Sequence, residues 1–175
     1  MRINENLQQI VEGKILAGFD ATPYPGDDAL VTNQSGCDPE SEEVFSDFRG
    51  KSWKEVPIEI LRKHKEALPL LTPRAFRYYL PAYMIGCVDS FYDVDVVLDS
   101  VLFNLTPPEP RRGWEWNFFR ERAEQFNEQE RDAITSFLEL MDRYQRADWA
   151  NEENESLRDR VKPALDFWRE LTSGP

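Results

Sequence analysis

The sequence contains few of the residues from which catalytic and metal sites are usually built. It has one histidine, His64, and two cysteines, Cys37 and Cys87, which form neither a C-x-x-C pair nor another spacing typical of zinc ligands. The motifs G-x-S-x-G, G-x-G-x-x-G and H-E-x-x-H and the P-loop are also missing. We expect His64, which lies among cations in LRKHKEAL, on a solvated helix face, and Cys87 to be a buried packing residue. The sequence indicates no cofactor, and enzymatic activity has little support.

Long apolar runs are missing as well. No stretch approaches the roughly 18 to 20 apolar residues that are needed to cross a bilayer. The first residues, MRINENLQQIVEGKIL, carry acids and amides where a signal peptide needs an apolar centre. We therefore expect a cytoplasmic protein with reduced thiols and no membrane partner.

Positive charge is in short supply. Against 33 acidic residues there are 21 basic ones, a net charge of −12, which repels nucleic-acid phosphate and argues against direct nucleic-acid binding. The excess is local: residues 20–50 contain eight acids and one base, net −7, whereas residues 51–90 contain seven bases and four acids, net +3. Such a local acidic patch can steer a protein partner that has a basic surface.

Strand signals are scarce, whereas apolar residues at helical spacing recur along the chain. Residues 93–105 are rich in valine and could form a strand, but their apolar positions also keep helical spacing, which favours a helix. A length of 175 residues with 41% hydrophobic composition fits one compact domain with a core. We predict a single all-α domain, residues 1–175, of about six to eight helices, with an irregular acidic loop near the N-terminus.

Capping and breaking residues set the expected helix boundaries. The first helix should end near Gly18, and Asp38 should cap a second helix that has Pro39 in its first position. Asn127 and Glu130 have the spacing of a capping box. Pro81 should break or kink an apolar helix into two pieces, and the Pro-rich segment 106–110 should form a stiff connector.

The acidic segment, residues 20–50, permits three interpretations. A Pro-Gly turn can simply precede a charged helix start, where carboxylates interact favourably with the helix dipole. The same carboxylates can form a partner-facing surface, or they can supply oxygen ligands to Ca²⁺ or Mg²⁺, although YPGDDALVTNQS lacks the ligand alternation and terminal Glu of a calcium loop. The candidate partner-binding residues here are Asp27, Asp28, Glu40, Glu42 and Glu43.

Arginines lie beside aromatic residues in two further places. Arg74 and Arg77 flank an aromatic-rich block, residues 76–92, and Trp114 and Trp116 lie between the arginines of RRGWEWNFFRER. Most of these aromatic residues should form the core, and the tryptophans could fold back on it as a lid. A mixture of arginine and aromatic residues is also typical of binding hot spots, so all four residues are candidates for partner binding.

Three segments occur in an order that resembles a known family. YPGD (24–27), GKSW (50–53) and LTPRAFRYYLPAYM (71–84) are similar to the motifs of a family of uncharacterised small bacterial proteins, a domain of unknown function. The resemblance covers residues 19–88, and we place no motif in the second half. It implies a bacterial or phage-associated cytoplasmic protein and brings no catalytic residues.

Two hypotheses from different classes follow. The favoured one is a non-enzymatic binding protein, for example an immunity protein or an inhibitor in bacterial or phage conflict, that engages a basic protein partner through the acidic segment and adjacent aromatic residues. The alternative is a small metal-assisted enzyme that uses the carboxylates of Asp27, Asp28 and Glu43. Self-association into a homo-oligomer through the aromatic block is compatible with either hypothesis.

Overall fold

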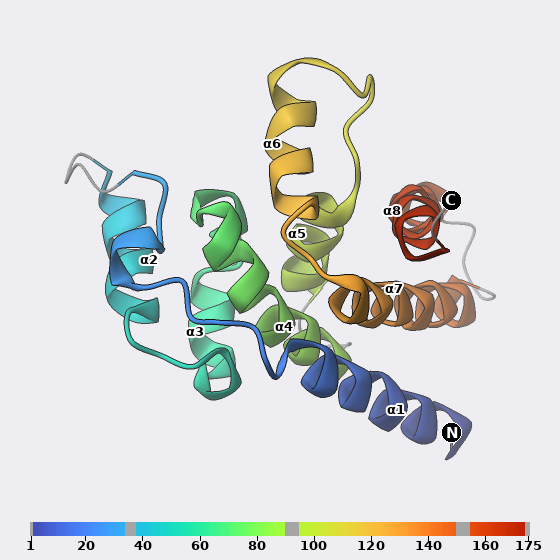
Figure 1. Ribbon diagram of the computed structural model, residues 1–175. Coiled ribbons are helices and arrows are strands. Elements are labelled where there is room, and N and C mark those ends of the chain that lie inside the picture. Colours follow the sequence, from blue (N-terminus) through green and yellow to red (C-terminus); the bar gives the residue numbers. More distant parts are fainter. Residues whose placement is uncertain (1, 34–37, 90–94, 150–154, 174–175) are drawn as a thin grey trace.

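Helices account for all regular structure in the computed structural model, which describes residues 2–33, 38–89, 95–149 and 155–173 (Figure 1). No strand forms within these ranges, where only an isolated bridge joins Val31 to Leu71. The all-α prediction is therefore confirmed. The elements are α1 (Arg2–Phe19), η1 (Asp27–Ala29), α2 (Pro39–Phe48), η2 (Trp53–Glu55), α3 (Ile58–Lys63), η3 (Leu68–Leu70), α4 (Pro73–Asp89), α5 (Asp95–Leu105), α6 (Gly113–Ala123), α7 (Glu128–Trp149) and α8 (Glu155–Ser173).

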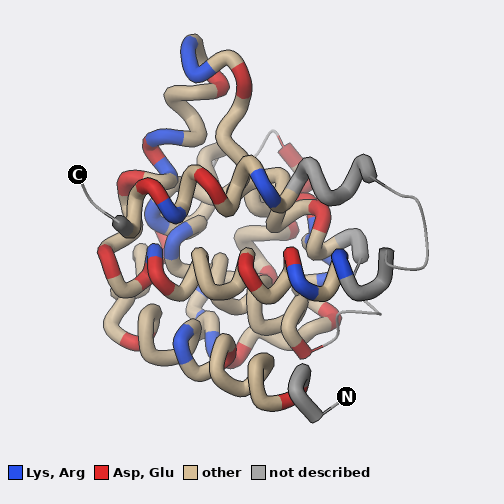
Figure 2. Tube along the Cα trace, turned by 90° about the vertical axis from the view of Figure 1, so that its right-hand side faces the viewer, with Lys and Arg blue, Asp and Glu red and all other residues tan. Residues whose placement is uncertain are grey.

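The helices are arranged around α4. Helix α1 packs against both α4 and α7, and α7 pairs with α8, while α2 and α3 lie at the opposite end of the molecule from α8 (Figure 1). Helix α6 projects from the body of the molecule (Figures 1 and 2). Among the described residues, no helix is long and apolar enough to span a membrane.

Helix α4 is buried on nearly every side, with 12 of its 17 residues in the core. A helix in the centre of a domain needs apolar residues around its whole circumference, which explains the aromatic block of the sequence. The helix continues through Pro81, so the chain does not break there, whereas a kink at this residue stays a prediction. Proline removes its own N–H from the helical ladder and its ring crowds the carbonyl four residues earlier, while the burial of the Pro81 ring in the core opposes these costs.

The predicted caps are confirmed. The Asp38 side chain accepts hydrogen bonds from the Glu40 N–H and the Ser41 hydroxyl at the start of α2. In the capping box of α7, the Asn127 N–H donates to Glu130 Oε2 at 2.8 Å and the Glu130 N–H donates to Asn127 Oδ1 at 2.9 Å. These contacts satisfy backbone donors that a helix start leaves unpaired.

Gly18 does not end α1, which runs on to Phe19. A Cβ at this position would lie 3.0 Å from the Gln129 carbonyl oxygen and 3.2 Å from the Ala133 Cβ. The glycine therefore allows the close approach of α1 to α7, a role that its own sequence neighbourhood does not reveal.

Candidate functional site

The three segments that resemble family motifs meet in space, beside the acidic segment. The Tyr24 hydroxyl donates to Asp27 Oδ1 at 2.7 Å and accepts from the Gly50 N–H at 2.9 Å. The Tyr24 ring packs edge-on against Tyr78, with the ring centroids 5.3 Å apart. One side chain thus connects the YPGD turn, the start of GKSW and the aromatic face of α4.

Two buried tyrosines of α4 complete this junction. The Tyr79 hydroxyl lies 2.8 Å from the Phe48 carbonyl oxygen and 2.9 Å from that of Lys51, and the Tyr83 hydroxyl donates to the His64 carbonyl at 2.7 Å. Burial raises the pKa of both phenols well above the usual range. They therefore remain neutral hydrogen-bond donors that hold the α2–α3 region to α4, which is a structural role.

Several acids of the segment are paired within the chain. The Tyr24 hydroxyl and the Arg49 guanidinium hold the pKa of Asp27 below its usual value, with Arg49 Nε 2.8 Å from Asp27 Oδ2. Lys54 forms an ion pair with Asp20 and lowers the pKa of that carboxyl group. Arg49 and Lys54 thus compensate part of the negative charge of the segment.

Asp47 of α2 accepts two further contacts. Lys63 Nζ lies 2.8 Å and His64 Nε2 lies 2.7 Å from Asp47 Oδ2, and hydrogen bonds from Lys63 first and His64 second lower the pKa of this carboxyl group. His64 is 5% exposed and packs against the Phe48 ring, so its prediction as a solvated residue is wrong. The reason is that α3 ends at Lys63, so His64 follows the helix and packs against α2.

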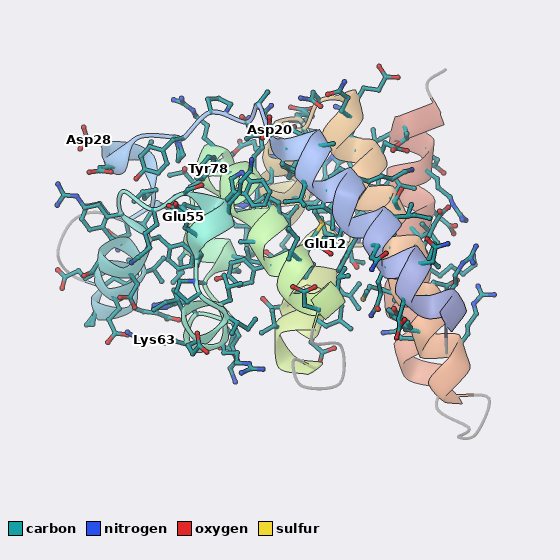
Figure 3. All side chains as sticks on the ribbon, turned by 90° about the horizontal axis from the view of Figure 1, so that it is seen from below. Glu12, Asp20, Asp28, Glu55, Lys63 and Tyr78 are labelled. Carbon is teal, nitrogen blue, oxygen red and sulfur yellow. The ribbon has the colours of Figure 1, made fainter. Side chains whose placement is uncertain are left out.

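Other acids of the segment face solvent. Glu40 and Glu42 are exposed in the first turn of α2 and form no ion pair with another described residue, whereas Glu43 lies 3.7 Å from Lys63 Nζ. Asp28 is exposed in η1, which lies beside α2 at the same end of the molecule (Figures 1 and 3). We call Asp28, Glu40, Glu42 and Glu43 the α2 acidic face.

The metal alternative gains no geometric support. Among the residues that the structure describes, no three or more His, Cys, Asp or Glu side chains are grouped so that they could hold a metal ion. Both oxygens of Asp27 are engaged by Tyr24 and Arg49 instead. The carboxylates of the alternative hypothesis therefore serve as hydrogen-bond acceptors or face solvent.

The two arginines of α4 have different surroundings. Arg74 is exposed, whereas the Arg77 side chain is only 23% exposed and Arg77 Nε lies 2.9 Å from Glu130 Oε2. Glu130 is fully buried and also accepts a hydrogen bond from the Thr22 hydroxyl at 2.5 Å. Arg77 is thus part of an internal ion pair that joins α4 to the start of α7.

The two tryptophans of α6 also differ in their exposure to solvent. Trp114 is 75% exposed at the start of the projecting helix. Trp116 is half-buried, stacks on Phe119 and packs edge-on against the Phe167 ring of α8. Of the two tryptophans predicted to fold back on the core, only Trp116 does so. Because α6 and α2 project from different parts of the molecule, these candidates do not form one surface with the acidic segment (Figure 1).

One further feature is a groove of about 400 Å³ between α1, η2, α3 and α4. Its residues come from three separate stretches of the chain, 12–16, 53–61 and 82–89, so no single motif could have indicated it. Glu12 and Leu16 of α1 form one wall, Val56 and Ile58 form another, and Ile85 and Asp89 of α4 contribute to the floor.

Together these features describe an all-α protein whose motif residues build a junction between helices. The chain belongs to a family of unknown function (DUF6714), whose model matches residues 28–172. This match confirms the resemblance to a family without a known activity, and it extends through the second half of the chain. Searches of curated proteins and of solved structures find no match.

Proposed function

We propose that this protein is a non-enzymatic binding protein that recognises a basic protein partner through the α2 acidic face. An immunity protein or an inhibitor in bacterial or phage conflict would act in this way, by covering a cationic site of its target. Such a protein would work in the cytoplasm.

The observation that carries the proposal is that some acids of the acidic segment are paired with basic side chains and others are not. Asp20, Asp27 and Asp47 are bound by basic side chains of the same chain. Glu40 and Glu42 are instead exposed to solvent, without an ion pair in the part of the chain that the structure describes, on a helix that the buried Val44 and Phe48 anchor to the core. Fixed, unpaired carboxylates on a rigid element present a preorganised negative potential to a partner.

Folding stability does not require this arrangement. An exposed carboxylate in the first turn of a helix contributes about 0.3 to 1 kcal/mol through the helix dipole. Removing its charge should therefore leave the fold intact. The effect on the association rate with a basic partner should be larger, because carboxylates at the rim of an interface steer the encounter.

The test compares two triple variants that remove the same amount of charge. The first is Asp28→Asn/Glu40→Gln/Glu42→Gln. The control is Glu5→Gln/Glu128→Gln/Glu170→Gln, which changes exposed glutamates of other helices and includes one, Glu128, in the first turn of α7. A partner captured from the native host is identified and purified, and its association with each variant is measured at low and at physiological salt.

We expect the first variant to associate at least about tenfold more slowly at low salt, with a flatter salt dependence, while the control keeps the wild-type behaviour. Equal rates and salt slopes for wild type and both variants would overturn the proposal. A loss of the same size in both variants would also overturn it, because the effect would then come from net charge alone.

A further inference from the structure

The groove between α1 and α3 offers a second, deeper contact for the same partner. We propose that it receives an arginine or lysine side chain from an apolar segment of the basic partner protein, an inference that depends on the proposed function. The α2 acidic face would steer the encounter, and the groove would hold the bound partner in place.

The floor of the groove is one stripe of α4. Ala82, Ile85, Gly86 and Asp89 follow one another at spacings of three, one and three residues, so they lie on the same side of the helix. Ala82 and Gly86 are small, so they fill little of the groove. At Gly86 the packing is already close, since an added Cβ would lie 3.0 Å from Ile58 Cδ1.

The walls are apolar and partly open to solvent. Leu16 of α1 is 39% exposed, although it belongs to a helix whose opposite side is buried against α7. Val56 and Ile58 on the other wall are only half-buried. These side chains form an apolar surface that the hydrocarbon part of a lysine or arginine side chain of the partner can cover, as the methylene groups of these residues commonly do.

The charges that line the groove favour a cation. Glu12 and Asp89 form no ion pair with any other residue that the structure describes, and Lys54, the basic residue in the lining, is already bound to Asp20. Figure 3 shows Glu12 between α1 and α4. Burial also raises the pKa of the Asp89 carboxyl group, because partial desolvation disfavours its charged form.

The occupant that fits best is therefore a side chain with an apolar stem and a positive end. A purely apolar occupant would cover Glu12 and Asp89 without pairing them, at a cost in desolvation. An acidic occupant would meet like charge. Arginine and lysine satisfy both the apolar walls and the two carboxylates.

The test uses a defined probe, so it does not need the natural partner. The probe is an amphipathic helical peptide of leucine and arginine, and the comparison peptide carries glutamate in place of arginine. The groove variant is Glu12→Gln/Asp89→Asn. The control variant, Glu40→Gln/Glu42→Gln, removes the same charge from the α2 acidic face. Binding is followed through the backbone amide signals of the ¹⁵N-labelled protein.

We expect the arginine peptide to shift the amide signals of Leu16 and Ile85, and the groove variant to bind it about tenfold or more weakly. The control variant should bind it within about twofold of wild type, and the glutamate peptide should not bind. Equal losses in both variants, or signals that shift all over the acidic surface, would overturn the inference and show non-specific charge attraction.

The two proposals can fail separately. With the captured partner, the α2 triple variant reports on association, whereas the groove variant should speed dissociation. If the partner dissociates from the groove variant at the wild-type rate, the proposed role of the groove is refuted, even where the α2 acidic face does bind the partner. Since Glu12 and Asp89 form no ion pair within the described part of the chain, circular dichroism should show a folded groove variant of at least wild-type stability.

Discussion

The buried carboxylate of Glu130 is expected to be the most sensitive single side chain of the fold. It is 0% exposed, and Arg77 Nε lies 3.0 and 2.9 Å from its two oxygens. The Thr22 hydroxyl and the Asn127 N–H donate to it as well. Thus one carboxylate connects the turn after α1, the first half of α4 and the start of α7.

Replacing Glu130 with glutamine keeps the shape and removes the charge. The amide nitrogen cannot accept a hydrogen bond, so at least one of the surrounding donors loses its acceptor. Arg77 loses its counter-ion in a largely buried position. Breaking a buried ion pair from one side costs about 3 to 5 kcal/mol, which for a chain of this size is a fall in Tm of about 6 to 20 °C.

Urea unfolding at neutral pH, followed by circular dichroism, measures this loss. The matched control is Glu139→Gln on the same helix, because Glu139 forms an exposed ion pair with Arg169 at 2.7 Å. We expect the control to lose less than about 1 kcal/mol. In a double-mutant cycle, Arg77→Met and Glu130→Gln should couple by more than about 1 kcal/mol. A loss below about 1 kcal/mol for Glu130→Gln, or strict additivity, would refute the reasoning.

Three further predictions concern other parts of the fold. In a Cys37→Ser background, Cys87 should resist a thiol reagent in the native protein and react fully in denaturant, because burial raises its pKa; rapid native labelling would contradict this. Trp114→Phe should remove most of the acrylamide-quenchable fluorescence at little cost in stability, because Trp114 is exposed. Trp168→Phe loses a 2.8 Å hydrogen bond to the Leu105 carbonyl and should destabilise the fold by about 1 to 3 kcal/mol. Equal stabilities of the two variants would contradict this. Because the pKa of Asp47 is lowered in the folded state, its stabilising effect is present above its usual value of 3.8 and disappears as the pH falls through the folded-state pKa. The stability difference between wild type and Asp47→Asn should therefore shrink in that acidic range, and a constant difference would count against the contact.

Local features of this fold were predictable because their physics spans only a few residues. The cap at Asp38 and the capping box of Asn127 and Glu130 depend on side chains that reach backbone donors two or three positions away. The helical stripe that buries Ile134 and Phe137 depends on a period of 3.6 residues. Such signals sufficed for the all-α class, the valine-rich helix α5 and the buried Cys87.

The candidate site was less predictable, because a sequence shows how many charges a segment has and not which of them are paired. The count of −7 over residues 20–50 is correct, yet Arg49, Lys54 and Lys63 neutralise part of it after folding. Arg77 illustrates the same limit, since it is placed against a glutamate 53 residues away. The sequence also offered no sign of the groove, whose residues come from separate segments.

By itself, then, the sequence determined the helices, their caps and the location of the acidic residues, since hydrogen bonding and apolar periodicity act between near neighbours. Only the tertiary structure decided that His64 is buried under α2, that Pro81 continues a central helix and that Glu12 and Asp89 share one groove. Each of these outcomes depends on which distant segments pack together. Packing selects among contacts by the apolar area they bury and the charges they leave unpaired, and those quantities exist only once the chain has folded.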